Sequence, residues 1–250
     1  MICFDEISLR RGHGKYVLVI SAPELGLVLD VLPDRNKATL EKWLDERGKT
    51  WREAIEVACS DMWDAYQTVA AEKLSNARRI VDRFHVMKNL NDALTKARRA
   101  IQKEADEDTK EILKGCRWLL VKNKENLKAE EQQKLHTMLE ASPELKACYE
   151  FKEAFRDLFN QELDYQSAEE RLLDWVARVE ASSFRALQFF VKTLRNWWQQ
   201  ILNYFVGRYT NGFAEGVNLK IKMLNRRGYG YHNFNSFRLH VLVAFDPVSR

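Results

Sequence analysis

Residues 2–9 read Ile-Cys-Phe-Asp-Glu-Ile-Ser-Leu, a β-rich stretch with a carboxylate among apolar residues. Side chains alternate between the two faces of a strand, so Asp5 shares its face with Cys3, Ile7 and Leu9. A carboxylate on an apolar face is costly unless something compensates it. The stretch therefore predicts a strand whose Asp5 is bound either to a metal ion or to an Arg partner.

The chain around this strand predicts a mixed sheet. Turns at 11–14 and 23–26 separate the first strand from strands at 16–21 and 27–32, which favours an antiparallel meander. Helices and strands then alternate. Strands separated by a helix usually pair in parallel through a right-handed crossover. The alternating elements are a helix at 37–47, a strand at 55–60, a helix at 62–74 and a strand at 79–84.

From His85 onward the pattern is helical. Val86, Leu90, Ala93, Ala97 and Ile101 form one apolar stripe at helical spacing. A last helix is expected from the N-cap candidate Asn211 to about Asn225, and 238–245 fits either a helix or a strand. Between these we expect helices at about 106–121, 129–140, 143–160, 167–180 and 183–206, with breaks at Pro143 and at Ser182-Ser183.

Composition bounds the class of protein. The 250 residues are 46% hydrophobic and 30% charged, which is typical of a globular chain. The absence of an apolar run of eighteen residues argues against a membrane span, and the acidic residues close to Met1 argue against a signal peptide. The four Cys are far apart without a CxxC pair, which argues against a Cys-based zinc site and a disulfide framework. We expect a cytoplasmic protein.

Charge is unevenly distributed along the chain. The net charge is +4 overall, but residues 175–250 carry +8 and residues 101–174 carry −6. A basic C-terminal third is typical of a surface that binds a polyanion. A solvated helix surface with a chance asymmetry is the alternative interpretation.

Two further acids are candidates for the same site as Asp5. Asp61 follows the strand at 55–60, where ligands gather in open α/β sheets, although taken alone this position favours a cap of the helix that begins there. Asp64, in the first turn of that helix, is better explained as a partner of the helix dipole. Glu215 lies in the first turn of the last helix among basic residues, with Asn218 on its face, and a salt bridge is its alternative role. Three acids from two strands and a helix can supply a two-metal clamp for a phosphodiester.

Several stretches of the chain match the motifs of a known family. They are FDEISLR (4–10), SDMWDAY (60–66), DRFHVMK (82–88), TNGFAEGVNLKIK (210–222), RRGYGY (226–231) and Asn233-Phe234. Through them the sequence resembles the DDE transposases of the ISL-three insertion-sequence group, over nearly the whole chain and with the motifs in order. The resemblance implies an α/β fold with an RNase H-like mixed five-stranded sheet flanked by helices, and a large all-helical insertion before the last catalytic helix. The implied segments are 1–102 (first part of the core), 103–205 (insertion) and 206–250 (rest of the core).

The resemblance also implies the chemistry. Asp5, Asp61 and Glu215 are then the catalytic acids, which would bind two Mg²⁺ ions, with Mn²⁺ as a substitute. Asp82 and His85, in a D-x-x-H element, and Asn218 would support these acids from behind. The implied activity is metal-dependent cleavage and transfer of DNA strands, with double-stranded DNA as partner and a homodimer or larger assembly on paired ends.

Basic residues near these motifs are candidates for phosphate contacts, which position DNA without reading its sequence. They are Lys88, Lys220, Lys222, Arg226, Arg227 and Arg238.

The sequence departs from the family pattern in two ways. Members usually carry an N-terminal zinc-binding and helix-turn-helix region, whereas this chain starts four residues before Asp5, so we expect a truncated copy or a fragment. Leu219 also stands where the family has Asn. Two other functions stay open: a non-catalytic DNA-binding relic, and a nuclease that cuts without joining.

Overall fold

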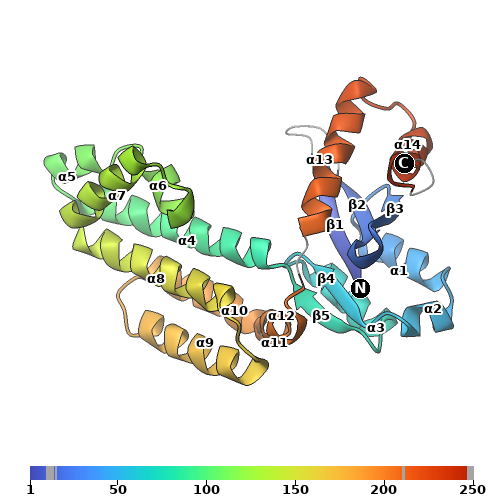
Figure 1. Ribbon diagram of the computed structural model, residues 1–250, viewed down its shortest axis with the longest axis horizontal. Helices are drawn as coiled ribbons and strands as arrows, with labels where there is room; N and C mark the ends of the chain where they lie inside the picture. The colour runs from blue at the N-terminus through green and yellow to red at the C-terminus, as the bar shows by residue number, and fades with distance from the viewer. Residues whose placement is uncertain (10–13, 15, 210–211, 247–250) are drawn as a thin grey trace. The chain divides into compact units, whose positions relative to one another are not determined.

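The structure is a computed structural model, and it describes residues 1–9, 14, 16–209 and 212–246. The chain divides into two compact units (Figure 1). The first, called here the sheet unit, comprises Met1–Arg83 and Gly207–Arg250. The second, the helical unit, comprises Phe84–Val206. The expected Asn211 cap and the turn at 11–14 fall largely outside the described residues.

The sheet unit contains the predicted five-stranded mixed sheet, in the order β3-β2-β1-β4-β5. β1 pairs antiparallel with β2, and β2 with β3, so the predicted meander is confirmed. β1 pairs parallel with β4, and β4 with β5, as the intervening helices predicted. The bounds are β1 (Ile2–Ser8), β2 (Tyr16–Ala22), β3 (Leu27–Leu32), β4 (Val57–Ser60) and β5 (Arg78–Val81).

Each face of the sheet is covered by helices, because alternate residues of its strands are apolar on both sides. Phe4, Leu18 and Ile20 pack with α1 (Lys37–Asp45) and α3 (Asp64–Lys73) on one face. Ile7, Val17 and Val19 pack with α13 (Gly212–Arg227) and α14 (Phe234–Phe245) on the other. The short α2 (Lys49–Glu53), which was not predicted, comes after α1. Figure 1 shows α13 beside β1 and β2.

The helical unit is held by an aromatic core. Phe155 contacts Trp175 and Phe190 edge-on, with ring centroids 4.8 and 5.4 Å away. A buried ion cluster of Lys152, Glu153 and Arg156 lies on the same helix. The helices are α4 (Arg83–Glu104), α5 (Glu107–Ile112), α6 (Arg117–Val121), α7 (Ala129–Ala141), α8 (Pro143–Asn160), α9 (Tyr165–Glu180), α10 (Arg185–Asn196), α11 (Trp198–Leu202) and α12 (Tyr204–Gly207).

Several predicted boundaries differ from the observed ones for local reasons. The stretch at 106–121 divides into α5 and α6, since Gly115 adopts a left-handed φ of 73°. The expected helix at 183–206 divides at Trp197, whose φ of −113° is not helical. The strand expected at 79–84 ends at Val81, and the open choice at 238–245 is decided in favour of a helix. No helix among the described residues is both long enough and apolar enough to cross a bilayer.

Asp30 ties three elements of the sheet unit together. Its carboxylate lies on β3 and is only 3% exposed. Oδ2 accepts hydrogen bonds from Trp43 Nε1 of α1 at 2.8 Å and from Arg238 Nη2 of α14 at 2.9 Å. Arg238 Nε donates to Oδ1, and Arg47 lies 3.6 Å from Oδ2. A buried carboxylate is tolerated here because cations and a donor surround it.

We expect Asp30→Asn to lower the free energy of unfolding by about 2–4 kcal/mol, because it leaves a buried network without its negative charge. Urea denaturation followed by circular dichroism measures the change. Glu46→Gln, at an exposed carboxylate of the same unit, is the matched control and should change stability by less than about 0.5 kcal/mol. Equal effects of the two substitutions would contradict this account.

The cysteines should be chemically inert in the folded chain. All four are buried and free. The neighbouring Cys3 thiol and burial raise the pKa of Cys59, burial raises the pKa of Cys148 to about 12, and burial also raises the pKa of Cys116. These thiols stay protonated below their raised pKa values, and the thiolate is the reactive form. At pH 8 we therefore expect almost no reaction with Ellman's reagent in buffer, and four reactive thiols per chain in urea. A rapidly reacting thiol in the native protein would refute this.

Candidate active site

Three aspartates lie at the same level on three neighbouring parallel strands. Phe4 of β1 is in register with Ser60 of β4, and Ser60 with Val81 of β5. The next residue along each strand is Asp5, Asp61 or Asp82. Asp82 N donates to Ser60 O at 2.8 Å, so the pairing continues past the last residue of β5. Because paired strands lie about 4.8 Å apart, these carboxylates lie side by side at the level where β4 and β5 end, which is called here one edge of the sheet.

The alternation of side chains decides which face these aspartates share. Ser60 accepts a hydrogen bond from Gln67 Nε2 at 3.0 Å, and Phe4 contacts the Tyr66 ring, so both face α3. Asp5 and Asp61 come directly after them and turn to the opposite face, where α13 lies. Asp61 Oδ1 is fully buried. The N-cap of α3 is Trp63, without a side-chain cap, so the interpretation of Asp61 as a helix cap is wrong.

Helix α13 is joined to β1 by two asparagines. Asn218 Nδ2 donates to Asp5 Oδ2 at 2.7 Å. Asn225 Nδ2 donates to Leu9 O at 3.2 Å, at the far end of β1. Residues later in the helix therefore lie beside residues later in the strand, so α13 and β1 run in the same direction. The amide of Asn218 fixes one orientation of the Asp5 carboxylate, whose Oδ1 accepts from Glu6 N at 2.8 Å.

Glu215 lies one helical turn before Asn218, on the same side of α13. Its side chain is exposed, and it makes no ion pair with a described residue, so the expected salt bridge is not formed within that part of the chain. The structure thus brings together Asp5, Asp61, Asp82 and Asn218, while Glu215 lies one turn earlier on the helix. Within the described ranges, no three His, Cys, Asp or Glu side chains are already grouped as metal ligands.

The carboxylates at this edge make it strongly negative. The buried Tyr66 hydroxyl lies on the α3 side of the same strands. Burial together with the charges of Glu6, Asp61 and Asp5 raises the pKa of Tyr66. Like charges in a partly desolvated site repel one another unless a cation is bound. The local chemistry therefore favours a cation with hard oxygen ligands.

Arg35 is a supporting residue next to this site that the sequence did not reveal. Its Nη1 donates to both carboxylate oxygens of Glu6, at 2.9 and 3.0 Å. The guanidinium also stacks on the rings of Tyr16 and Trp63, with centroids 4.3 and 4.7 Å away. Trp63 lies two residues after Asp61, so Arg35 holds the Asp61 loop against β1. No local pattern marks Arg35, because its partners come from separate segments of the chain.

The remaining predicted residues fall into three groups. His85 and Lys88 are on α4, in the helical unit, where Lys88 is exposed and the His85 ring contacts Phe84 edge-on. Lys220 donates to Ala244 O and lies over the Phe245 ring, and Arg238 is bound to Asp30. Lys222, Arg226 and Arg227 are exposed on α13.

The fold and the site define a class. A mixed sheet in the order β3-β2-β1-β4-β5, flanked by helices and with acids on β1 and directly after β4, is RNase H-like. The sequence profile of the ISL3 group of DDE transposases, described as "Transposase", matches residues 2–241. The chain belongs to this family.

Curated relatives agree with this assignment. The chain is 28% identical over 253 residues to the transposase for insertion sequence element IS1001 of Bordetella parapertussis, covering all of this chain and 62% of that protein. It is 26% identical over 256 residues to the transposase for IS1557 of Mycobacterium tuberculosis, covering 93% of this chain and 57% of the relative. A protein of Lactococcus lactis named as an ATP-dependent protease is 31% identical over 106 residues, covering 42% of this chain and 32% of the relative. The chain thus spans about 60% of the length of the two transposases, and no solved structure matches it.

Proposed function

We propose that this chain is the catalytic part of an insertion-sequence transposase that cuts and joins DNA strands at Asp5, Asp61 and Glu215. The observation that carries the proposal is the register of β1, β4 and β5, which sets Asp5 and Asp61 on one edge beside α13. Membership of the DDE transposase family gives this arrangement its reaction. Asp82 and Asn218 would then support the acids from behind, and His85 of the D-x-x-H element is proposed for the same role.

The residues at this edge fit Mg²⁺ or Mn²⁺. Carboxylate and amide oxygens are the hard ligands that these ions prefer. Asn218 Oδ1 is buried and has no hydrogen-bond partner among the described residues, although its amide nitrogen is bound to Asp5. A buried, unsatisfied acceptor beside carboxylates is accounted for by a cation at that place. When bound, such ions lower the pKa of an attacking oxygen and neutralise charge on the phosphate.

The chain's own groups would fix the geometry of two successive displacements. In the first, water attacks the phosphorus at the element end, and the broken P–O bond leaves a 3′-hydroxyl. In the second, that 3′-oxygen attacks a target phosphorus and displaces the target's 3′-oxygen. One phosphodiester forms as one breaks, so the joining step needs no energy source. Asp5 and Asp61 are held rigidly for this role by Asn218 and by the Arg35–Trp63 contact.

DNA would be held by the exposed basic side chains of α13, which are Lys222, Arg226 and Arg227. Phosphate contacts of this kind give affinity that falls with salt and carries no sequence information. Lys220 and Arg238 are engaged inside the sheet unit, so we leave them out of this set. Two element ends imply two copies of the chain on DNA, acting in the cytoplasm.

The triad is tested with pre-cut element ends, a plasmid target and Mn²⁺. We expect Asp5→Asn, Asp61→Asn and Glu215→Gln each to lower joined product by at least about 10³-fold, because each removes a ligand charge. Asp64→Asn, at an exposed acid three residues after Asp61 in the first turn of α3, is the matched control and should retain joining. The longer proteins of the family should be run beside this chain.

The same assay separates the alternatives. Cleaved but unjoined product from the wild type supports a nuclease, and DNA binding without either product supports a non-catalytic relic. Full joining by Asp61→Asn would exclude the proposed site.

Asn218→Ala should weaken Mn²⁺ binding about 10–100-fold, the usual effect of removing a residue that orients a metal ligand. Isothermal titration calorimetry of the folded chain measures this without any DNA. Asn235→Ala, at an exposed asparagine of the same unit, is the control. If Asp5→Asn abolishes Mn²⁺ binding while Asn218→Ala leaves it unchanged, the orienting role of Asn218 is wrong.

A further inference from the structure

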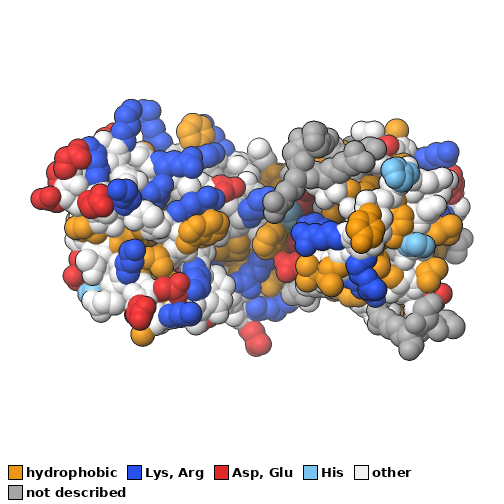
Figure 2. All heavy atoms as spheres, turned by 90° about the horizontal axis from the view of Figure 1, so that it is seen from above, with side chains coloured by type: hydrophobic (Ala, Val, Ile, Leu, Met, Phe, Trp, Pro, Cys, Tyr) orange, Lys and Arg blue, Asp and Glu red, His pale blue; other side chains and the backbone are white. Residues whose placement is uncertain are grey.

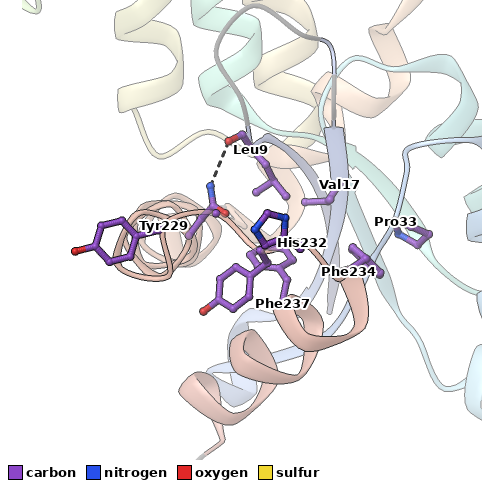
Figure 3. A pocket seen from close by; sticks show the side chains of 10 residues that line it. Leu9, Val17, Pro33, Tyr229, His232, Phe234 and Phe237 are labelled. Carbon is purple, nitrogen blue, oxygen red and sulfur yellow. Dashed lines mark hydrogen bonds between the residues drawn. The ribbon is translucent and has the colours of Figure 1, made fainter.

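A pocket of the sheet unit lies at the other end of the α13–β1 contact (Figure 3). Its volume is about 510 Å³, within the range of about 300–1,000 Å³ that is usual for small-ligand sites. It opens between β1, β2 and the turn that links α13 to α14. The described residues that line it are Leu9, Val17, Pro33, Asn225, Tyr229, Gly230, Tyr231, His232, Phe234 and Phe237.

The aromatic wall of this pocket is fixed by packing. The Tyr231 hydroxyl is hydrogen-bonded to His240 Nδ1 at 2.7 Å, and its ring centroid lies 5.4 Å from that of Phe237. Phe234 packs on Phe237 at 6.2 Å. Gly228 permits this packing, because a Cβ there would lie 2.8 Å from the Tyr231 ring. The flat walls are therefore formed before any ligand arrives.

The turn beside the pocket ends helix α13: Gly230 N donates to Asn225 O at 2.9 Å and Tyr229 N to Arg226 O at 3.1 Å. Tyr229 has a left-handed φ of 51°, which costs a non-glycine residue free energy. Its side chain is 100% exposed. Figure 3 shows this ring directed away from the other lining side chains. The Tyr229 ring therefore lies beside the pocket and does not form one of its walls.

Charge and polarity around the pocket suit a nucleotide. Arg226 and Arg227 are exposed in the last turn of α13, directly before the pocket residues, and no described acid lines the pocket. Asn225 uses its amide nitrogen on Leu9 O, which leaves its amide oxygen to accept. His232 is exposed and makes no hydrogen bond to a described residue. Figure 2 shows His side chains among hydrophobic ones on this face of the sheet unit, with Lys and Arg close by.

We propose that this pocket holds one unpaired base of the DNA strand. Every base has a flat π-face, so aromatic walls bind it with little dependence on sequence. Asn225 and His232 supply hydrogen-bonding groups for the base edge, as in sites that receive extruded bases. Arg226 and Arg227 supply cations for the flanking phosphates.

The distance to the aspartates gives the pocket a place on the substrate. Leu9 follows Asp5 by four residue steps, a rise of about 13 Å in extended chain, and Asn225 follows Asn218 by seven steps, about 10 Å along the helix. That span corresponds to about three or four nucleotide steps. The base would thus be unpaired a few nucleotides from the reacting bond; this placement, unlike the binding itself, rests on the proposed function.

The test compares two DNA duplexes that differ only in whether a single 2-aminopurine is paired or unpaired. We expect the intact chain to bind the unpaired form at least about fivefold more tightly, and stacking to quench its fluorescence. His232→Ala and Phe234→Ala should each remove most of that preference while leaving binding of the paired duplex unchanged. His232 is an exposed loop residue, so this variant remains informative if Phe234→Ala does not fold.

Two controls sharpen the result. Leu239→Ala, at an exposed residue of α14 outside the pocket, should keep the preference. Arg226→Gln should weaken both duplexes equally, because it removes a phosphate contact. Equal affinity for the two duplexes, or a preference that survives both pocket variants, overturns the inference. The joining assay with the triad variants then decides the proposed function independently.

Discussion

The parallel register of β1, β4 and β5 is the constraint on which the rest of the sheet unit depends. It sets Asp5, Asp61 and Asp82 at one level on neighbouring strands. Carboxylates so close repel one another, and near a protein surface that repulsion is on the order of a few kcal/mol. The packing of both sheet faces must therefore offset this electrostatic repulsion, and a bound cation would reduce it. A shift of one residue in β4 would turn Asp61 to the opposite face.

Helix α13 packs along β1 and covers the face of the sheet to which Asp5 turns. It runs in the direction of β1 and is joined to that strand at Asp5 and at Leu9. One end of the contact brings Asn218 to Asp5, with Glu215 one helical turn earlier on α13, and the other end borders the aromatic pocket. A single helix thus sets the spacing between a proposed reaction centre and a proposed base pocket, which lets one DNA strand contact both.

Two polar networks keep these elements in position. Asp30 joins β3 to α1 and to α14, the helix that packs beside α13. Arg35 joins Glu6 of β1 to the Trp63 side of the Asp61 loop. Arg238 pairs with the Asp30 carboxylate and Arg35 with the Glu6 carboxylate, and either carboxylate would be costly to bury without a cation. The position of the loop that carries Asp61 therefore depends in part on Arg35, which lies outside the site.

The sequence by itself determined the five strands, the antiparallel meander, the parallel pairs and the helical character of most residues after His85, because periodicity and crossover length are local properties. It also singled out Asp5, Asp61 and Glu215, through their place on predicted elements and the family motifs. Tertiary structure alone decided that Asn218 contacts Asp5, and that Arg238, expected on DNA, pairs with Asp30. Such pairings join residues about two hundred positions apart, and no local rule encodes which distant side chain completes a buried charge.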